Sequence, residues 1–345
     1  MTSNAPPPSD ERWVPEEEYV EAELVKESPV ASALAARQIP RTPRPQFIRR
    51  RRKRLPLILF LLTCASTFLA GALHWMPGEY LANSWLQQDA MPLRQALLKG
   101  WEDGLIYMGC VLAILLMHEM GHFVATLRYR VPASLPFFLP FPLSPIGTMG
   151  AVIGMDGKQA NRKETFDIGL AGPLAGLAVA VPVMWIGIQN LDLTTPAHGP
   201  FALDTPLAVR EIFAYASPPG YEPGKGVWLS QVNPYYMAGW VGLLVTGLNM
   251  LPVSQLDGGH VIYTVFGKRA HWIARSFMIM AITYIFVAGA WMWSLMVILV
   301  LLIGTDHPPT RDDTVPLGWF RIALGLVSLL IPLLCFPPNV FKIVE

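Results

Sequence analysis

Two histidines and a glutamate lie close together in an apolar stretch of this 345-residue chain. The stretch reads Leu116-Met117-His118-Glu119-Met120-Gly121-His122. Residues four apart share one face of a helix, so His118 and His122 can bind one zinc ion, with Glu119 beside them as general base. A charged side chain in a membrane-spanning helix costs roughly 2.5–3.5 kcal/mol, so such a cluster needs a compensating partner there. A bound metal provides that partner, and a purely structural polar cluster is the alternative.

A catalytic zinc site needs a third protein ligand, because such sites typically combine three protein ligands with a water. The candidate is Asp257, in Asn249-Met250-Leu251-Pro252-Val253-Ser254-Gln255-Leu256-Asp257-Gly258-Gly259-His260. Pro252 and the Gly258-Gly259 pair are expected to interrupt the helix there. Two alternatives stay open. Asp257 can instead cap a helix at the membrane edge, and His260 can be the ligand in its place or an interfacial residue near the metal.

The composition indicates a membrane protein. The chain is 52% hydrophobic and only 15% charged, whereas an average soluble domain carries about 25% charged residues. The formal net charge of +1 comes from segregated acidic and basic segments, and no nucleic-acid partner is expected. The cysteines lie in apolar runs without metal-type or redox-type spacing, so we expect buried, hydrophobic-like roles for Cys64, Cys110 and Cys335.

Apolar segments that could cross a bilayer, which takes about 20 residues, occur along most of the chain. They are expected at 55–75, 104–127, 168–188, 237–251 and 319–336, with two tight helices in 272–303 that break near Gly289. The sequence therefore predicts an all-α integral membrane protein with about seven transmembrane helices.

The N-terminal segment differs from the rest. Residues 1–54 are rich in Pro, Glu and Arg and end with the basic run from Arg49 to Arg54. Such a segment buries too little apolar surface to offset its ordering entropy, so a disordered tail is expected. Basic residues flank membrane spans on the cytoplasmic side. The tail and the end of the His118 span, where Arg128 follows, are thus predicted in the cytoplasm, and the loop at 189–236 outside.

The two motifs together resemble the site-2 protease family of intramembrane zinc metalloproteases, over about residues 104–270. Each motif alone is moderately specific, and both in this order on apolar segments are very specific. The resemblance implies one zinc ion per chain and a set of site residues: the zinc ligands His118, His122 and Asp257, the catalytic base Glu119, and Asn249 near the reacting carbonyl.

The resemblance also implies a function. The chain is expected to hydrolyse peptide bonds in or near transmembrane segments of membrane proteins in a lipid bilayer, with residues 55–345 as the protease domain. The loop at 189–236 is too short for an ordinary PDZ domain, and no CBS pair is expected after the last span. The chain therefore looks like a compact, plastid-and-cyanobacterial-like branch that also occurs in other bacteria. A bacterial inner membrane is the expected location.

The segment at 131–155 cannot be helical, because it contains repeated prolines followed by glycines, at Pro132, Pro136, Pro140, Pro142, Pro145, Gly147, Gly150 and Gly154. We expect a membrane-dipping hairpin, with Phe137, Phe138 and Phe141 at the interface. One edge can pair with an extended substrate. A hydrophobic plug against lipid is the alternative.

Three other functions stay open: an inactive membrane scaffold, a zinc transporter, and the prenyl-protein protease type, which takes a downstream glutamate as third ligand. For the last type Glu164 is available, although Arg162 and Lys163 beside it favour a solvated charge. Gly172 and Pro173 resemble the family's glycine-proline element, and small residues there let helices pack closely.

Overall fold

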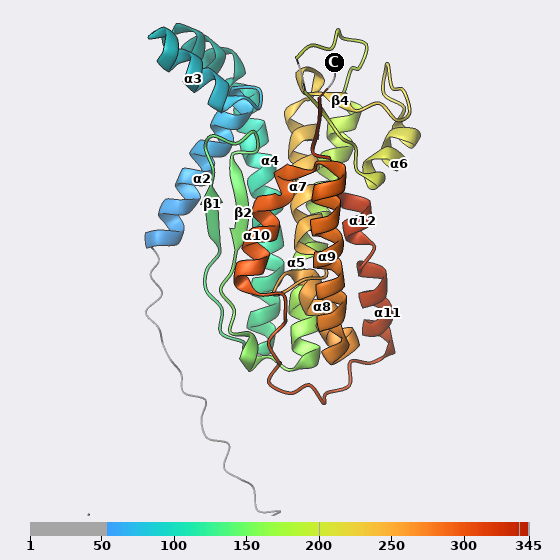
Figure 1. Ribbon diagram of the computed structural model, residues 1–345. Helices are drawn as coiled ribbons and strands as arrows, with labels where there is room; N and C mark the ends of the chain where they lie inside the picture. The colour runs from blue at the N-terminus through green and yellow to red at the C-terminus, as the bar shows by residue number, and fades with distance from the viewer. Residues whose placement is uncertain (1–53, 200, 338, 344–345) are drawn as a thin grey trace, which may run out of the picture. The chain divides into compact units, whose positions relative to one another are not determined.

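The computed structural model describes residues 54–199, 201–337 and 339–343, and most of them are helical (Figure 1). The predicted tail lies outside these residues apart from Arg54. The α-helices are α2 (Arg54–Ala72), α3 (Pro77–Gln87), α4 (Met91–Tyr129), α5 (Arg162–Gln189), α6 (Leu207–Ala216), α7 (Pro234–Asn249), α8 (Asp257–Phe266), α9 (Ala270–Ala288), α10 (Ser294–Ile303), α11 (Trp319–Ser328) and α12 (Ile331–Cys335). The short 3-10 helices are η1 (Gly157–Gln159), η2 (Leu229–Gln231), η3 (Gly267–Arg269) and η4 (Trp291–Trp293).

Four helical segments of the described chain are long and apolar enough to cross a membrane, rather than the expected seven. They are α2, α4, α5 and the continuous run Asp257–Ala288, which joins α8, η3 and α9. The remaining predicted segments form shorter helices: α7 has 16 residues and α10 has 10. The predicted break near Gly289 is confirmed, because Gly289 ends α9 in a left-handed conformation with φ 66°. Hydropathy therefore located the apolar segments but did not fix their helical lengths.

Large apolar side chains cover the outward faces of these helices. On α2 the leucines and isoleucine at Leu55, Leu57, Ile58, Leu61 and Leu62 are each at least half exposed. On α10 the same is true of Leu302 and Ile303. A soluble protein rarely exposes so large a contiguous apolar surface. Together with the four long helices, this surface identifies a membrane protein.

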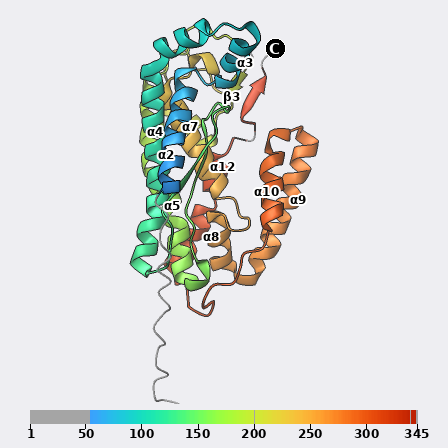
Figure 2. The ribbon, with the colours of Figure 1, turned by 90° about the vertical axis from the view of Figure 1, so that its left-hand side faces the viewer.

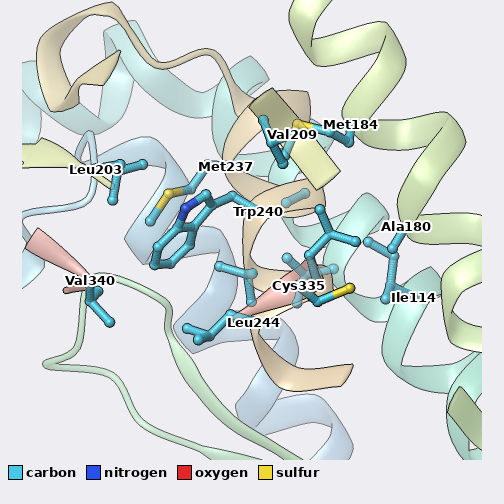
Figure 3. Close-up of a cluster of buried hydrophobic side chains, with 14 of the residues drawn as sticks. Ile114, Ala180, Met184, Leu203, Val209, Met237, Trp240, Leu244, Cys335 and Val340 are labelled. Carbon is cyan, nitrogen blue, oxygen red and sulfur yellow. The ribbon is translucent and has the colours of Figure 1, made fainter. Parts of the chain in front are cut away.

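Helix α7 lies at the centre of the bundle and is buried on nearly every side. Its Trp240 packs within a cluster of aliphatic side chains contributed by several helices (Figure 3). The indole Nε1 of Trp240 donates a hydrogen bond to the carbonyl of Asp204 at 2.9 Å. Cys335 of α12 lies in the same cluster, so its predicted buried role is confirmed, whereas Cys64 and Cys110 are only partly buried. A helix that is apolar all round belongs in such a core.

Two small sheets accompany the helices, and the first lies in the segment where a hairpin was expected. Strands β1 (Phe137–Pro140) and β2 (Thr148–Val152) form an antiparallel hairpin in the proline-rich segment. The second sheet has the order β4-β3-β5 and consists of β3 (Phe201–Leu203), β4 (Val227–Trp228) and β5 (Phe341–Ile343). Proline removes a backbone donor and fixes φ, which excludes a helix but is compatible with short edge strands.

The hairpin is attached to α2 and α4 by side chains. Phe138 is buried and meets Phe60 of α2 edge to face, with ring centroids 5.2 Å apart. Ser66 of α2 donates to the carbonyl of Gly147, and Tyr107 of α4 donates to that of Ile146 at 2.7 Å. Phe138 therefore holds the hairpin in the fold, whereas interfacial exposure was predicted for it. On the other side of the bundle α9 and α10 lie together beside α8, away from α4 (Figure 2).

Candidate active site

Helix α4 carries the histidine pair on its buried face. His118, Glu119 and His122 are each less than a tenth exposed. The two imidazole rings lie 5.0 Å apart between centroids, as the four-residue spacing predicts. Helix α4 packs against α5 and α7, so three largely apolar helices surround these polar groups. His118 and His122 thus share one face of α4, and Glu119 lies beside them in the buried interior.

The turn between α7 and α8 brings a carboxylate to the histidines. Helix α7 ends at Asn249, and Asp257 is the first residue of α8. Asp257 Oδ2 lies 3.2 Å from Nε2 of His118, and its Oδ1 lies 3.3 Å from Nε2 of His122. The side chain thus bridges both rings, although 139 positions separate Asp257 from His118 in the sequence.

The sequence suggested that the glycine pair after Asp257 interrupts a helix. Instead, both glycines lie in the first turn of α8. A β-carbon on Gly258 would lie 2.0 Å from the carbonyl oxygen of Met250, and one on Gly259 would lie 2.2 Å from that of Ser254. Neither contact is possible in a folded protein. The two glycines therefore let α8 begin directly against the preceding turn, and this close approach fixes the position of Asp257.

The three side chains fit a metal ion. Their ligand atoms all lie within 4.8 Å of one another. Two ligands about 2.0–2.1 Å from a tetrahedral zinc are about 3.3–3.4 Å apart. The distance from each imidazole Nε2 to the nearer of the two Asp257 carboxylate oxygens is close to this spacing. Two histidines with one carboxylate is also a donor set of known catalytic zinc sites. The geometry and the donor chemistry therefore agree.

The second nitrogen of His122 supports the same conclusion. Its Nδ1 lies 2.8 Å from the carbonyl oxygen of Ile168 on α5, and since a carbonyl only accepts, Nδ1 carries the hydrogen. In the neutral ring, Nε2 then directs a lone pair at the Asp257 carboxylate. A metal ion placed between the two groups would take this lone pair and the carboxylate oxygen as ligands. Such outer hydrogen bonds are typical of ligating histidines.

Two glycines of α5 make room for the imidazole rings. A β-carbon on Gly172 would lie 2.0 Å from Nε2 of His122, and one on Gly176 would lie 3.0 Å from Nδ1 of His118. Close helix packing was the only role that the sequence suggested for this glycine-rich element. The structure shows that these positions also receive the ring atoms of the site. Their four-residue spacing matches that of the two histidines, and this was the signal available in the sequence.

A cavity of about 160 Å³ opens beside these groups. Glu119 and Asn249 both line it, and Asn249 Nδ2 lies 3.3 Å from Nε2 of His118. Ala151 and Val152 of β2 form part of another wall. The cavity therefore brings together the candidate metal ligands, a buried carboxylate, an amide and the backbone of a strand.

Two other candidate ligands lie elsewhere. His260 lines the cavity, but its Nδ1 contacts His307 at 2.6 Å, and it is not part of the three-residue metal group. Glu164 forms a capping box with Asn161 at the start of α5 and pairs with Arg311 at 3.5 Å. Glu164 is therefore a helix cap rather than the third metal ligand, and it is not the solvated charge that its neighbours suggested.

Comparison with known proteins gives the family. The model of Peptidase family M50 matches residues 106–293, which is more than half of the chain. This chain belongs to Peptidase family M50. The resemblance to the site-2 protease family is thereby confirmed.

The M50 chain is also similar to curated plant proteins. It is 31% identical over 298 residues to "Probable zinc metalloprotease EGY1, chloroplastic" of Oryza sativa subsp. japonica, a match that covers 82% of this chain and 50% of the relative. It is 30% identical over 294 residues to the protein of the same name in Arabidopsis thaliana, with 82% and 53% covered. The chain thus spans about half the length of these relatives.

Proposed function

We propose that this M50 protein is an intramembrane zinc metalloprotease that hydrolyses peptide bonds in or near transmembrane segments of membrane proteins. The observation that carries the proposal is the convergence of two histidines, an aspartate and a buried glutamate on one cavity between long apolar helices. The printed names of the relatives, probable zinc metalloproteases, point to the same activity. A buried Glu119 beside a complete ligand set favours catalysis over a scaffold or a zinc transporter.

In this proposal His118, His122 and Asp257 hold one zinc ion per chain. Zinc bound there would lower the pKa of a water toward about 7 and polarise the scissile carbonyl. The carboxylate of Glu119 accepts a proton from the attacking water and later passes it to the leaving amine. The amide of Asn249, beside His118, donates a hydrogen bond to the carbonyl oxygen on which negative charge develops.

The hairpin is proposed to present the substrate. A transmembrane helix hides its peptide bonds in its own hydrogen bonds, so cleavage requires local unwinding. Strand β2 pairs with β1 along one edge and lines the cavity with Ala151 and Val152. An unwound substrate segment that adds a strand at the second edge of β2, which has no partner strand in the described two-stranded sheet, would regain hydrogen bonds where water is scarce. We propose that the hairpin dips into the membrane for this purpose, with Phe138 anchoring it to α2.

The proposed location is a membrane with the tail and the site toward the cytoplasm. The Lys/Arg bias of the sequence supports this orientation. From His118 to Arg128 is ten residues, so the metal site lies roughly 15 Å from that end of the helix at about 1.5 Å per residue. The printed names of the relatives are chloroplastic and give no support to a bacterial inner membrane, which stays a prediction from the sequence.

The test is cleavage of reconstituted membrane-protein substrates by the wild-type chain and by Glu119→Gln. The wild type should release fragments, and the variant should lose at least about 99% of the rate while binding zinc normally, because only the proton acceptor is removed. Gly109→Ala is a matched control on the same helix, because a β-carbon there meets nothing within 4 Å. Cleavage by Glu119→Gln at the wild-type rate, or none by zinc-loaded wild type on any membrane protein, would refute the proposal.

A further inference from the structure

Aromatic and titratable side chains form a cluster behind the cavity, where the loop between α10 and α11 packs on α8 and α9. His307 of the loop is buried, and its ring stacks on Tyr263 with centroids 4.4 Å apart. The hydroxyl of Tyr263 donates to Asp313 of the same loop at 2.8 Å. Arg275 of α9 pairs with Asp306 at 2.7 Å. The ring stacking and the Tyr263–Asp313 hydrogen bond hold the loop against α8, whereas the Arg275–Asp306 pair on α9 is about half exposed.

His260 connects this cluster to the cavity. It lies three residues after Asp257 on α8, so the two side chains share a helix face. Its Nδ1 is 2.6 Å from Nε2 of His307, and the two rings meet edge to face with centroids 4.7 Å apart. His260 lines the cavity together with the candidate ligands and Glu119. One ring nitrogen of His260 therefore contacts the loop, and the other is left for the cavity.

The hydrogen bonds determine which of these nitrogens carry protons. His307 Nδ1 lies 2.5 Å from the carbonyl oxygen of Pro308, and because a carbonyl only accepts, this nitrogen carries a hydrogen. Burial lowers the pKa of His307, so the ring is neutral and its Nε2 is an acceptor. His260 Nδ1 must then donate to His307. A neutral His260 consequently keeps a lone pair on Nε2.

We propose that His260 is a further catalytic residue, whose Nε2 accepts a hydrogen bond from the attacking water, and that His307 is the positioning residue that fixes this tautomer. The inference rests on the proposed function. One proton of the water goes to Glu119, and the other O–H group is held by His260. The water oxygen forms the new bond to the carbonyl carbon. The C–N bond then breaks, and the leaving amine takes the proton from Glu119.

Two substitutions of His260 separate its two nitrogens. In His260→Asn the amide nitrogen takes the place of Nδ1 and still donates to His307, but nothing reaches the position of Nε2. In His260→Gln the longer amide places an acceptor near the position of Nε2 and gives up the contact with the loop. We expect kcat to fall roughly tenfold to a hundredfold in His260→Asn, since one hydrogen bond to the reacting groups is lost. KM and zinc content should be unchanged, and His260→Gln should recover most of the rate.

The opposite order, with His260→Asn normal and His260→Gln impaired, would show that His260 only anchors the loop and would overturn the inference. Equal losses in both variants would overturn it too. Asp306→Asn is the matched control on the loop, because it removes an exposed ion pair next to His307 and should leave kcat unchanged.

The role of His307 has a readout that does not depend on activity. In protein with ¹⁵N-labelled histidine, NMR should report the Nδ1–H tautomer for His260 in the wild type and in His307→Gln, whose amide oxygen can accept the same hydrogen bond. His307→Leu should lose this signature and should lower kcat as His260→Asn does. An Nε2–H tautomer in the folded wild type would refute the inference while leaving the proposed protease activity intact. Wild type that binds zinc and cleaves nothing would instead refute the proposed function.

Discussion

Replacing Gly172 with alanine should remove His122 from the metal site without touching a ligand residue. The added β-carbon would lie 2.0 Å from Nε2 and 2.4 Å from both Cδ2 and Cε1 of the ring. Contact between these atoms requires roughly 3.4 Å or more, so the ring or helix α5 must move by more than about 1 Å. The hydrogen bond from Nδ1 to Ile168, at 2.8 Å, ties the ring to α5 and opposes any simple rotation.

The magnitude follows from the tolerance of zinc coordination. Ligand distances vary by only about 0.2 Å between working sites, so a shift of about 1 Å removes the ligand. Loss of outer contacts alone weakens metal binding about 10- to 100-fold, and a displaced ligand should cost at least the upper figure, or about 2.8 kcal/mol. At Gly176 the β-carbon would lie 3.0 Å from His118, so a shift of a few tenths of an ångström suffices. The expected loss there is about tenfold or less.

The assay is competition for zinc between a chelator and detergent-purified protein, with thermal unfolding measured in parallel. The loss in affinity should be largest for Gly172→Ala, smaller for Gly176→Ala and absent for Gly109→Ala, where a β-carbon meets nothing within 4 Å. If folded Gly172→Ala held zinc as tightly as Gly109→Ala, His122 would not be a ligand in the observed position.

Three further outcomes are expected. Asp257→Ala should lower zinc occupancy in elemental analysis while His260→Ala keeps it, and the reverse result would identify His260 as the third ligand. With the native cysteines replaced, Thr195→Cys should react with an impermeant thiol reagent from outside and Lys158→Cys should not, and the opposite pattern would reverse the orientation argued from charge. Val152→Ala should slow cleavage of a stiff substrate helix more than cleavage of a helix with Gly/Pro breakers near the cut. Equal loss on both substrates would exclude substrate presentation by β2. Phe138→Ala should instead destabilise the fold by about 3–5 kcal/mol.

Local patterns in the sequence were sufficient for several features. The four-residue spacing of His118 and His122 fixed their common helix face, because helical periodicity needs no tertiary information. A single glycine, Gly289, marked the end of α9, since a left-handed residue is favourable mainly for glycine. The prolines between β1 and β2 excluded a helix there. The order of the two motifs was also enough to indicate the family.

Only the tertiary structure decided how distant segments meet. Asp257 is brought to the histidines by the close approach of α8 to the preceding turn, which the bulk of any side chain at Gly258 or Gly259 would prevent. The space that Gly172 leaves for His122 also arises only when α4 and α5 pack together. The contact between His260 and His307, which are 47 positions apart, likewise depends on the tertiary fold. Such contacts depend on how whole helices pack, and packing is set by the shapes of many side chains together. The length of each membrane helix likewise follows from its neighbours, because a short buried helix such as α7 satisfies its apolar surface against protein rather than lipid.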